Sequence, residues 1–273
     1  MNVSLDSSVA DPTPSDRTAH ELPTLLTIVV AGLTLGASVA GLSLDAPLVH
    51  GPSPVRAFVA QDLTSLLVAV PLLVGSLRLA RRHSLAGQLL WMGALLHVAS
   101  THAVYVLGTR FSALLPVYVA VVAASMYALI DLVVDVDADA VKAAFGRRAP
   151  TRAVGAFLVA AAAALVFSSN PGSPLGLAPA TAHPLVESLD LALLIPTILA
   201  AGALLWRRRP WGFVLAGVLL PKVALIGLTA AISAAPSLPR LSAVALAAVG
   251  AVAAGSYLRT IERGAAPLPS LGA

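Results

Sequence analysis

Long apolar stretches follow one another along most of the chain, separated by short connections that are basic or rich in proline, glycine and serine. Each stretch is about as long as an α-helix must be to cross a hydrocarbon core of roughly 30 Å. This pattern predicts an all-α, polytopic membrane helix bundle with about eight transmembrane helices. The expected spans, of which the fifth is the shortest, are residues 24–43, 58–80, 85–107, 111–134, 153–169, 187–206, 211–233 and 241–258.

Composition supports the membrane interpretation. Of all residues, 58% are hydrophobic and only 11% are charged, whereas roughly a quarter of a soluble protein is charged. The polar, mostly acidic residues 1–22 lack the basic start and apolar core of a secretory signal peptide, so we expect a disordered tail there. The absence of cysteine excludes disulfides, thiol catalysis and cysteine metal ligands.

Lysine and arginine are unevenly divided between the two sets of connections, and such residues are retained on the cytoplasmic side of a membrane. With the N-terminus inside, the inner segments hold thirteen of them and the outer connections three, while Lys222 lies within a span. The chain is therefore predicted to lie in the cell inner (cytoplasmic) membrane with both termini cytoplasmic. Because the basic residues border apolar segments, the net charge of +4 indicates membrane lipid and no nucleic acid as a partner.

The expected organisation is two membrane halves joined by a cytoplasmic connector. The connector carries three aspartates followed by basic residues, around Val141 and Phe145, which is typical of a short amphipathic segment at a membrane surface. The predicted units are a cytoplasmic tail at 1–22, a first half of four helices at 23–134, the connector at 135–151, a second half of four helices at 152–260, and a cytoplasmic tail at 261–273.

A shift of 125 residues brings polar positions of the two halves into register without a gap, which favours an internal repeat. Because each half would hold four helices, the copies would share one orientation, as a parallel 4+4 repeat about an axis along the membrane normal. The alternative is a chance alignment of two apolar hairpins. The aligned pairs are Asp62 with Glu187, Pro71 with Pro196, Arg82 with Arg207 and His97 with Lys222.

The candidate site follows from these ionisable residues. Lys222 lies halfway along the seventh span, directly after Pro221, and a charge at that depth costs at least about 2.5–3.5 kcal/mol, so it should face the bundle interior with a partner. A spacing of four residues places His97, Thr101 and Tyr105 on one helix face. We expect a polar cavity, open to the outer side and walled by the second, third, sixth and seventh helices, whose residues are Asp62, His97, Thr101, His102, Tyr105, Glu187, Asp190 and Lys222.

Structural interpretations of the same residues stay open at this point. Asp62, Glu187 and Asp190 lie near the outer boundary, where a solvated helix cap is an adequate explanation. His97 and His102 would be neutral at pH 7 and could be hydrogen-bonded parts of the helix core. A buried ion pair of Lys222 could equally have structural duties only.

Two stretches of the chain carry similar motifs. The first runs from Asp62-Leu63 through Pro71 and Arg81-Arg82-His83-Ser84-Leu85 to Leu89-Leu90-Trp91, and its counterpart runs from Leu189-Asp190-Leu191 through Trp206 to Gly212. In these motifs, residues 55–233 resemble a group of uncharacterised bacterial multi-pass membrane proteins. The resemblance implies a membrane protein and carries no activity, substrate or site residue.

Three function classes remain. The first is a small secondary transporter or permease for a small molecule or ion, with a polar site in mid-membrane. The second is a membrane-embedded enzyme or lipid-binding protein, in which His97 would be the general base and Lys222 would stabilise an anion. The third is an accessory or assembly subunit with a structural polar core. The chain contains no phosphate-binding loop, GxSxG or HExxH motif, so no cofactor or metal is indicated and an enzyme is less expected than a transporter.

Overall fold

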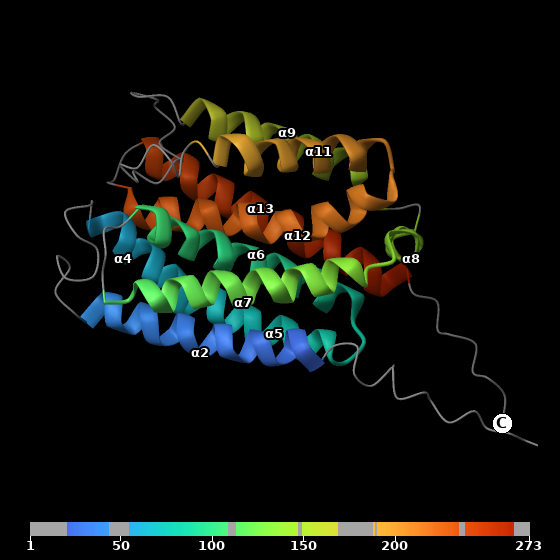
Figure 1. The fold of residues 1–273 in the computed structure, drawn as a ribbon. Coiled ribbons are helices and arrows are strands. Elements are labelled where there is room, and N and C mark those ends of the chain that lie inside the picture. The colour runs from blue at the N-terminus through green and yellow to red at the C-terminus, as the bar shows by residue number, and fades with distance from the viewer. Residues whose placement is uncertain are drawn as a thin grey trace, which may run out of the picture.

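The computed structural model describes residues 21–43, 55–108, 113–146, 149–168, 188, 190–234 and 238–264. In this part of the chain the secondary structure is helical, without strands, and long helices lie side by side as a bundle (Figure 1). The prediction of an all-α, multi-pass membrane helix bundle is therefore confirmed.

Seven of the described helical stretches are long and apolar enough to cross a membrane. The fifth span, expected to be the shortest, is the shortest of these seven, with 18 residues. The described part of the sixth expected span is a shorter apolar helix, Ala192–Trp206. The segment before it, residues 169–187, lies outside the described residues. The helices are α2 (Glu21–Ser43), α4 (Val55–Thr64), η1 (Ser65–Ala69), α5 (Val70–Ala80), α6 (Leu85–Gly108), α7 (Leu115–Val134), α8 (Ala138–Ala144), α9 (Thr151–Ser168), η2 (Asp190–Leu194), α11 (Ile195–Trp206), α12 (Pro210–Ser233) and α13 (Leu238–Gly264).

Helices α6 and α12 form the centre of the bundle and are its two most buried spans. They pack against each other, with α5 and α7 on α6 and with α4, α11 and α13 on α12. Gly93 allows this close approach, because a Cβ atom there would lie 2.6 Å from the carbonyl oxygen of Val218. Small residues at such contacts are typical of helix packing in membranes. The middles of α6 and α12 are therefore held together at the core of the protein.

The two basic turns, α5–α6 and α11–α12, lie at the same end of the bundle as α8 (Figure 1). In each turn one residue adopts a left-handed conformation, with φ of 59° at His83 and 53° at Arg208. Asp137 caps the N-terminus of helix α8, and its carboxylate accepts hydrogen bonds from the backbone amides of Asp139 and Ala140. The ring of Phe145 packs on those of the α12 and α13 aromatics, with centroid separations of 5.2 Å and 4.4 Å. This end carries the charges that predict a cytoplasmic location.

Elements separated by 125 residues have the same form. The π-helical turn Ser65–Ala69 corresponds to Asp190–Leu194, and each is followed by a helix with a proline at its second position. Helices α6 and α12 are both 24 residues long and correspond from end to end. The left-handed residues of the two basic turns are also 125 residues apart. Residues 65–108 and 190–233 thus share a closely similar pattern of helices and irregular turns, whereas α2 and α9, and α7 and α13, differ in length.

A candidate polar site at the contact between the two halves

A buried carboxylate from α4 meets a buried phenol from α6. The hydroxyl group of Tyr105 donates a hydrogen bond of 2.8 Å to Oδ1 of Asp62 and lies 3.3 Å from the carbonyl oxygen of Phe58. Only 3% of Asp62 and 1% of Tyr105 is exposed, and Asp62 lies about 10 Å along the helix axis from the first residue of α4. The interpretation of Asp62 as a solvated helix cap is therefore wrong.

The expected polar stripe on α6 continues inward from this pair. The hydroxyl of Thr101 lies 3.5 Å from Nε2 of His97, one helical turn away. The side-chain amide of Gln61 approaches the carbonyl oxygen of Thr101 at 3.4 Å, which ties α4 to the same stripe. His97 and Thr101 are buried. The spacing of four residues thus gives one continuous polar face that is closed off from lipid and solvent.

Lys222 joins this stripe from the second half of the chain. Its ammonium group donates a hydrogen bond to the hydroxyl of Ser100, which in turn donates to the carbonyl oxygen of His97 over 2.9 Å. His97 is the thirteenth residue of α6 and Lys222 the thirteenth of α12. The lysine is only 5% exposed, so the mid-membrane charge does face the bundle interior, as predicted. The contact places ionisable groups of both halves in one cluster.

His102 lies at the outer end of the cluster among aromatic rings. Its Nδ1 atom is 2.9 Å from the carbonyl oxygen of Val98, and its ring lies 5.9 Å from the rings of both Tyr105 and Tyr118. A histidine that bonds its own helix backbone and packs between rings is well accounted for as part of the helix core. Its geometry favours a role in holding the tyrosines.

Two residues of this site are not identified by the sequence reasoning. Tyr118 of α7 stacks on Tyr105 with ring centroids 4.7 Å apart, and its buried hydroxyl has no hydrogen-bond partner among the described residues. Gly41 of α2 faces the carboxylate of Asp62 so closely that a Cβ atom there would collide with Oδ2. A tyrosine within an otherwise apolar span was the available signal for Tyr118. Nothing in the local sequence distinguishes Gly41.

The remaining predicted site residues cannot be compared with the structure. Glu187 and the side chain of Asp190 lie outside the described residues, as do the outer connections 44–54 and 169–187. The predicted cavity open to the outer face therefore stays a prediction. Within the described residues, no three side chains of His, Asp, Glu or Cys gather as metal ligands would.

No family model, curated protein or solved structure matches this chain. The function is therefore argued from the polar cluster itself.

Proposed function

We propose that this protein is a small secondary transporter or permease, built from two repeated halves, that couples a proton or cation to the movement of a small solute. Asp62 would accept the coupling ion, and His97 and Lys222 would hold the charge of the solute at mid-membrane. The observation that carries the proposal is the buried polar connection from α4 through α6 to Lys222 of α12. It crosses the contact between the halves, where transporters with repeated halves bind their substrates.

The free-energy cost of this cluster supports a functional role. Ionisable side chains in the hydrocarbon region are expensive to insert and therefore mark ion or substrate pathways in most membrane proteins. A purely structural network would be expected to satisfy its members, since an unsatisfied buried polar group costs about 1–3 kcal/mol. Yet Nδ1 of His97 and the hydroxyl of Tyr118 have no hydrogen-bond partner among the described residues. These groups are available to a solute or to water.

The π-helical turns support a change of shape at the depth of the site. Such turns are rare and occur frequently at functional sites, and they bend the helix that contains them. The turn Ser65–Ala69 starts three residues after Asp62, and Pro71 is the second residue after it. The turn Asp190–Leu194 stands in the same relation to Pro196. A bend at the same depth in each half suits a transporter whose halves move relative to each other.

Corresponding helix boundaries favour gene duplication over a chance alignment of two apolar hairpins. The correspondence extends beyond helix length to glycines at helix crossings. Gly87 and Gly212 are 125 residues apart, and a Cβ atom at either would collide with the backbone of the preceding helix. Chance similarity of apolar helices gives no reason for matching irregular turns and matching glycines. Copies of four helices would share one orientation in the membrane.

The test is to measure charge movement in reconstituted protein after a rapid pH change, by solid-supported membrane electrophysiology. Wild type is expected to give a transient current, because a proton enters the buried site, and Asp62→Asn is expected to lose most of it. Asp131→Asn is the matched control, since Asp131 lies at the other end of α7, away from the cluster. The same preparation is then screened with amino acids, organic acids and organic cations for currents coupled to the pH step.

Equal currents in wild type and Asp62→Asn would contradict the role of Asp62. A wild-type protein that is folded and gives no current with protons or with any of these solutes would contradict transport and favour the accessory subunit. A conversion of lipid by the reconstituted protein that requires His97 would favour the membrane enzyme.

A further inference from the structure

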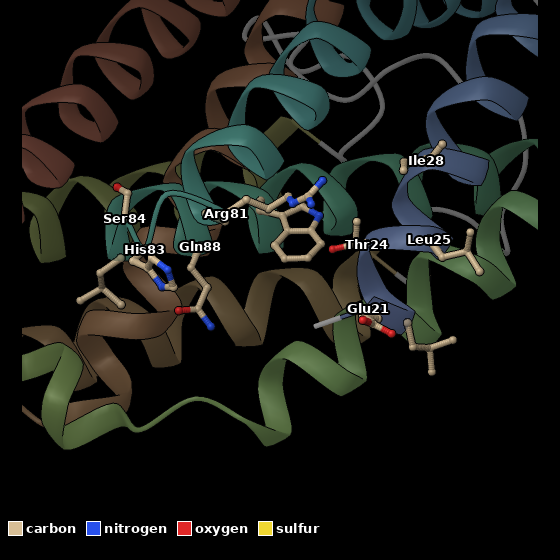
Figure 2. A pocket seen from close by; sticks show the side chains of 12 residues that line it. Glu21, Thr24, Leu25, Ile28, Arg81, His83, Ser84 and Gln88 are labelled. Carbon is tan, nitrogen blue, oxygen red and sulfur yellow. The ribbon is translucent and has the colours of Figure 1, made fainter. Parts of the chain in front are cut away.

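A groove of about 1050 Å³ lies at the end of the bundle that carries the α5–α6 turn, and no residue of the polar cluster lines it (Figure 2). One wall is the first two turns of α2, and the other is the end of α5, the basic turn and the start of α6. At its base lies the buried Trp91, whose indole N–H donates a 2.9 Å hydrogen bond to the hydroxyl of Thr27. The volume is that of a site for a small amphipathic molecule.

The lining of the groove is divided into an apolar and a charged part. Leu25 and Ile28 on α2 supply the apolar part, and both are more than half exposed, which in a membrane means that they face lipid. The charged part consists of Glu21 at the first residue of α2 and Arg81 at the end of α5. Both charges lie where an apolar span ends, which is the depth of lipid headgroups. The groove thus combines an acid and a base at the headgroup level with apolar contacts toward the hydrocarbon.

Only one of the two adjacent arginines in the α5–α6 turn lines the groove. Arg81 lines the groove together with His83, Ser84 and Gln88, whereas Arg82, which is exposed like Arg81, does not belong to the lining. One acidic and one basic side chain therefore face the same space. A purely anionic headgroup would meet the carboxylate of Glu21 as a repulsive neighbour. A headgroup that carries a phosphate and an ammonium group complements both charges.

The corresponding helix contact in the second half of the chain is made by two glycines. The residues 125 positions after Val30 and Leu77 are Gly155 and Gly202, and a Cβ atom at either glycine would lie 2.9 Å from the carbonyl oxygen of the other. Helices α9 and α11 can therefore approach closely, whereas the corresponding positions of α2 and α5 carry the larger side chains of Val30 and Leu77, both buried. The groove therefore lies beside a helix contact of the first half whose counterpart, between α9 and α11, is a close contact of two glycines.

We propose that this groove binds a zwitterionic glycerophospholipid with a primary ammonium headgroup, as in phosphatidylethanolamine, from the leaflet on the side of the basic turns. The guanidinium group of Arg81 would bind the phosphate, and the carboxylate of Glu21 would accept hydrogen bonds from the ammonium group. The acyl chains would lie along Leu25 and Ile28. This site is independent of the proposed transport function and can be tested without a substrate.

The test uses full-length protein equilibrated with equal amounts of phosphatidylethanolamine, phosphatidylcholine and phosphatidylglycerol of identical acyl chains, followed by native mass spectrometry. We expect phosphatidylethanolamine to be retained at least about threefold over either of the others, which is the scale of one partly exposed charge-assisted contact. Glu21→Gln should remove this preference, because a neutral amide no longer attracts the ammonium group. Arg81→Gln should reduce retention of all three phospholipids about threefold or more.

Arg82→Gln is the matched control and should leave both the preference and the total retention unchanged. Equal retention of the three lipids by wild type, or preference for phosphatidylglycerol, would overturn the proposal. So would a Glu21→Gln variant that keeps the wild-type preference. Retention that appears only after residues 1–20 are removed would show that the chain's own N-terminal segment occupies the groove, and would also overturn it.

Discussion

Two regions of the molecule, residues 21–108 in the first half of the chain and 151–233 in the second, have similar helices from the π-helical turn onward but make different contacts. In the first half, α2 packs against α4, α5 and α7 and faces the Asp62–Tyr105 pair and the groove at the basic turn. In the second half, α9 packs chiefly against α11. The π-helical turns and the helices that follow them have closely matching boundaries, whereas α2 has 23 residues and α9 has 18. At positions 125 residues apart the side chains differ in size and charge, as between Leu77 and Gly202 or between His97 and Lys222.

The largest effect on stability is expected at the contact of α9 with α11, where glycine is needed for close packing. Gly202→Ala would force α9 and α11 apart, because the new Cβ atom would lie 2.9 Å from the carbonyl oxygen of Gly155. We expect the free energy of unfolding to fall by about 2 kcal/mol, the usual cost of overpacking. SDS titration of the protein in mixed micelles measures this change.

Gly255→Ala is the control for that variant, because a Cβ atom at Gly255 meets nothing within 4 Å. It should leave stability unchanged or slightly raised, since alanine is the better helix former. An equal fall in the free energy of unfolding of the two variants would contradict the explanation that glycines allow α9 and α11 to pack closely.

A smaller effect is expected in the first half from Tyr105→Phe. The variant keeps the ring stack on Tyr118 and removes the hydrogen bond to Asp62. The free energy of unfolding should therefore fall by about 1 to 1.5 kcal/mol, which lies between the average for a hydrogen bond within a membrane protein and the value for a hydrogen bond to a charged acceptor. The same SDS titration measures it. Tyr127→Phe serves as the control because Tyr127 is 69% exposed. A loss as large as that of Gly202→Ala would mean that Asp62 holds the first half together and is chiefly structural.

Much of this architecture can be predicted from the sequence, because the signals involved are local. Apolar length gives the helices, and basic turns such as Arg81-Arg82 mark their ends. The spacing of His97, Thr101 and Tyr105 predicts a polar stripe on α6, and the contacts of these side chains lie on the one helix face that the spacing predicts. The depth of Lys222 indicates that it faces the interior, and its hydrogen bond to Ser100 agrees with this.

What the sequence does not predict depends on contacts between distant segments. The burial of Asp62 could not be told from a solvated cap, because the helices that cover it come from other parts of the chain. Gly41 is close to Asp62 only through the packing of α2 on α4. The close approach of α9 and α11 likewise rests on Gly155 and Gly202, which meet only in the folded bundle. Apolar helices carry little local information about such pairings.

The most direct test of the central claim is whether the buried cluster can be reached from both sides of the membrane. Because the chain contains no cysteine, Thr101→Cys provides a single thiol beside His97, and Ser125→Cys provides an equally buried control on α7. Right-side-out and inside-out vesicles are treated with a membrane-impermeant maleimide over a range of pH. A transporter predicts that position 101 is labelled from both sides, in proportions that change with pH, while position 125 is not. Labelling of position 101 from neither side, or from one side only, in folded protein would contradict alternating access.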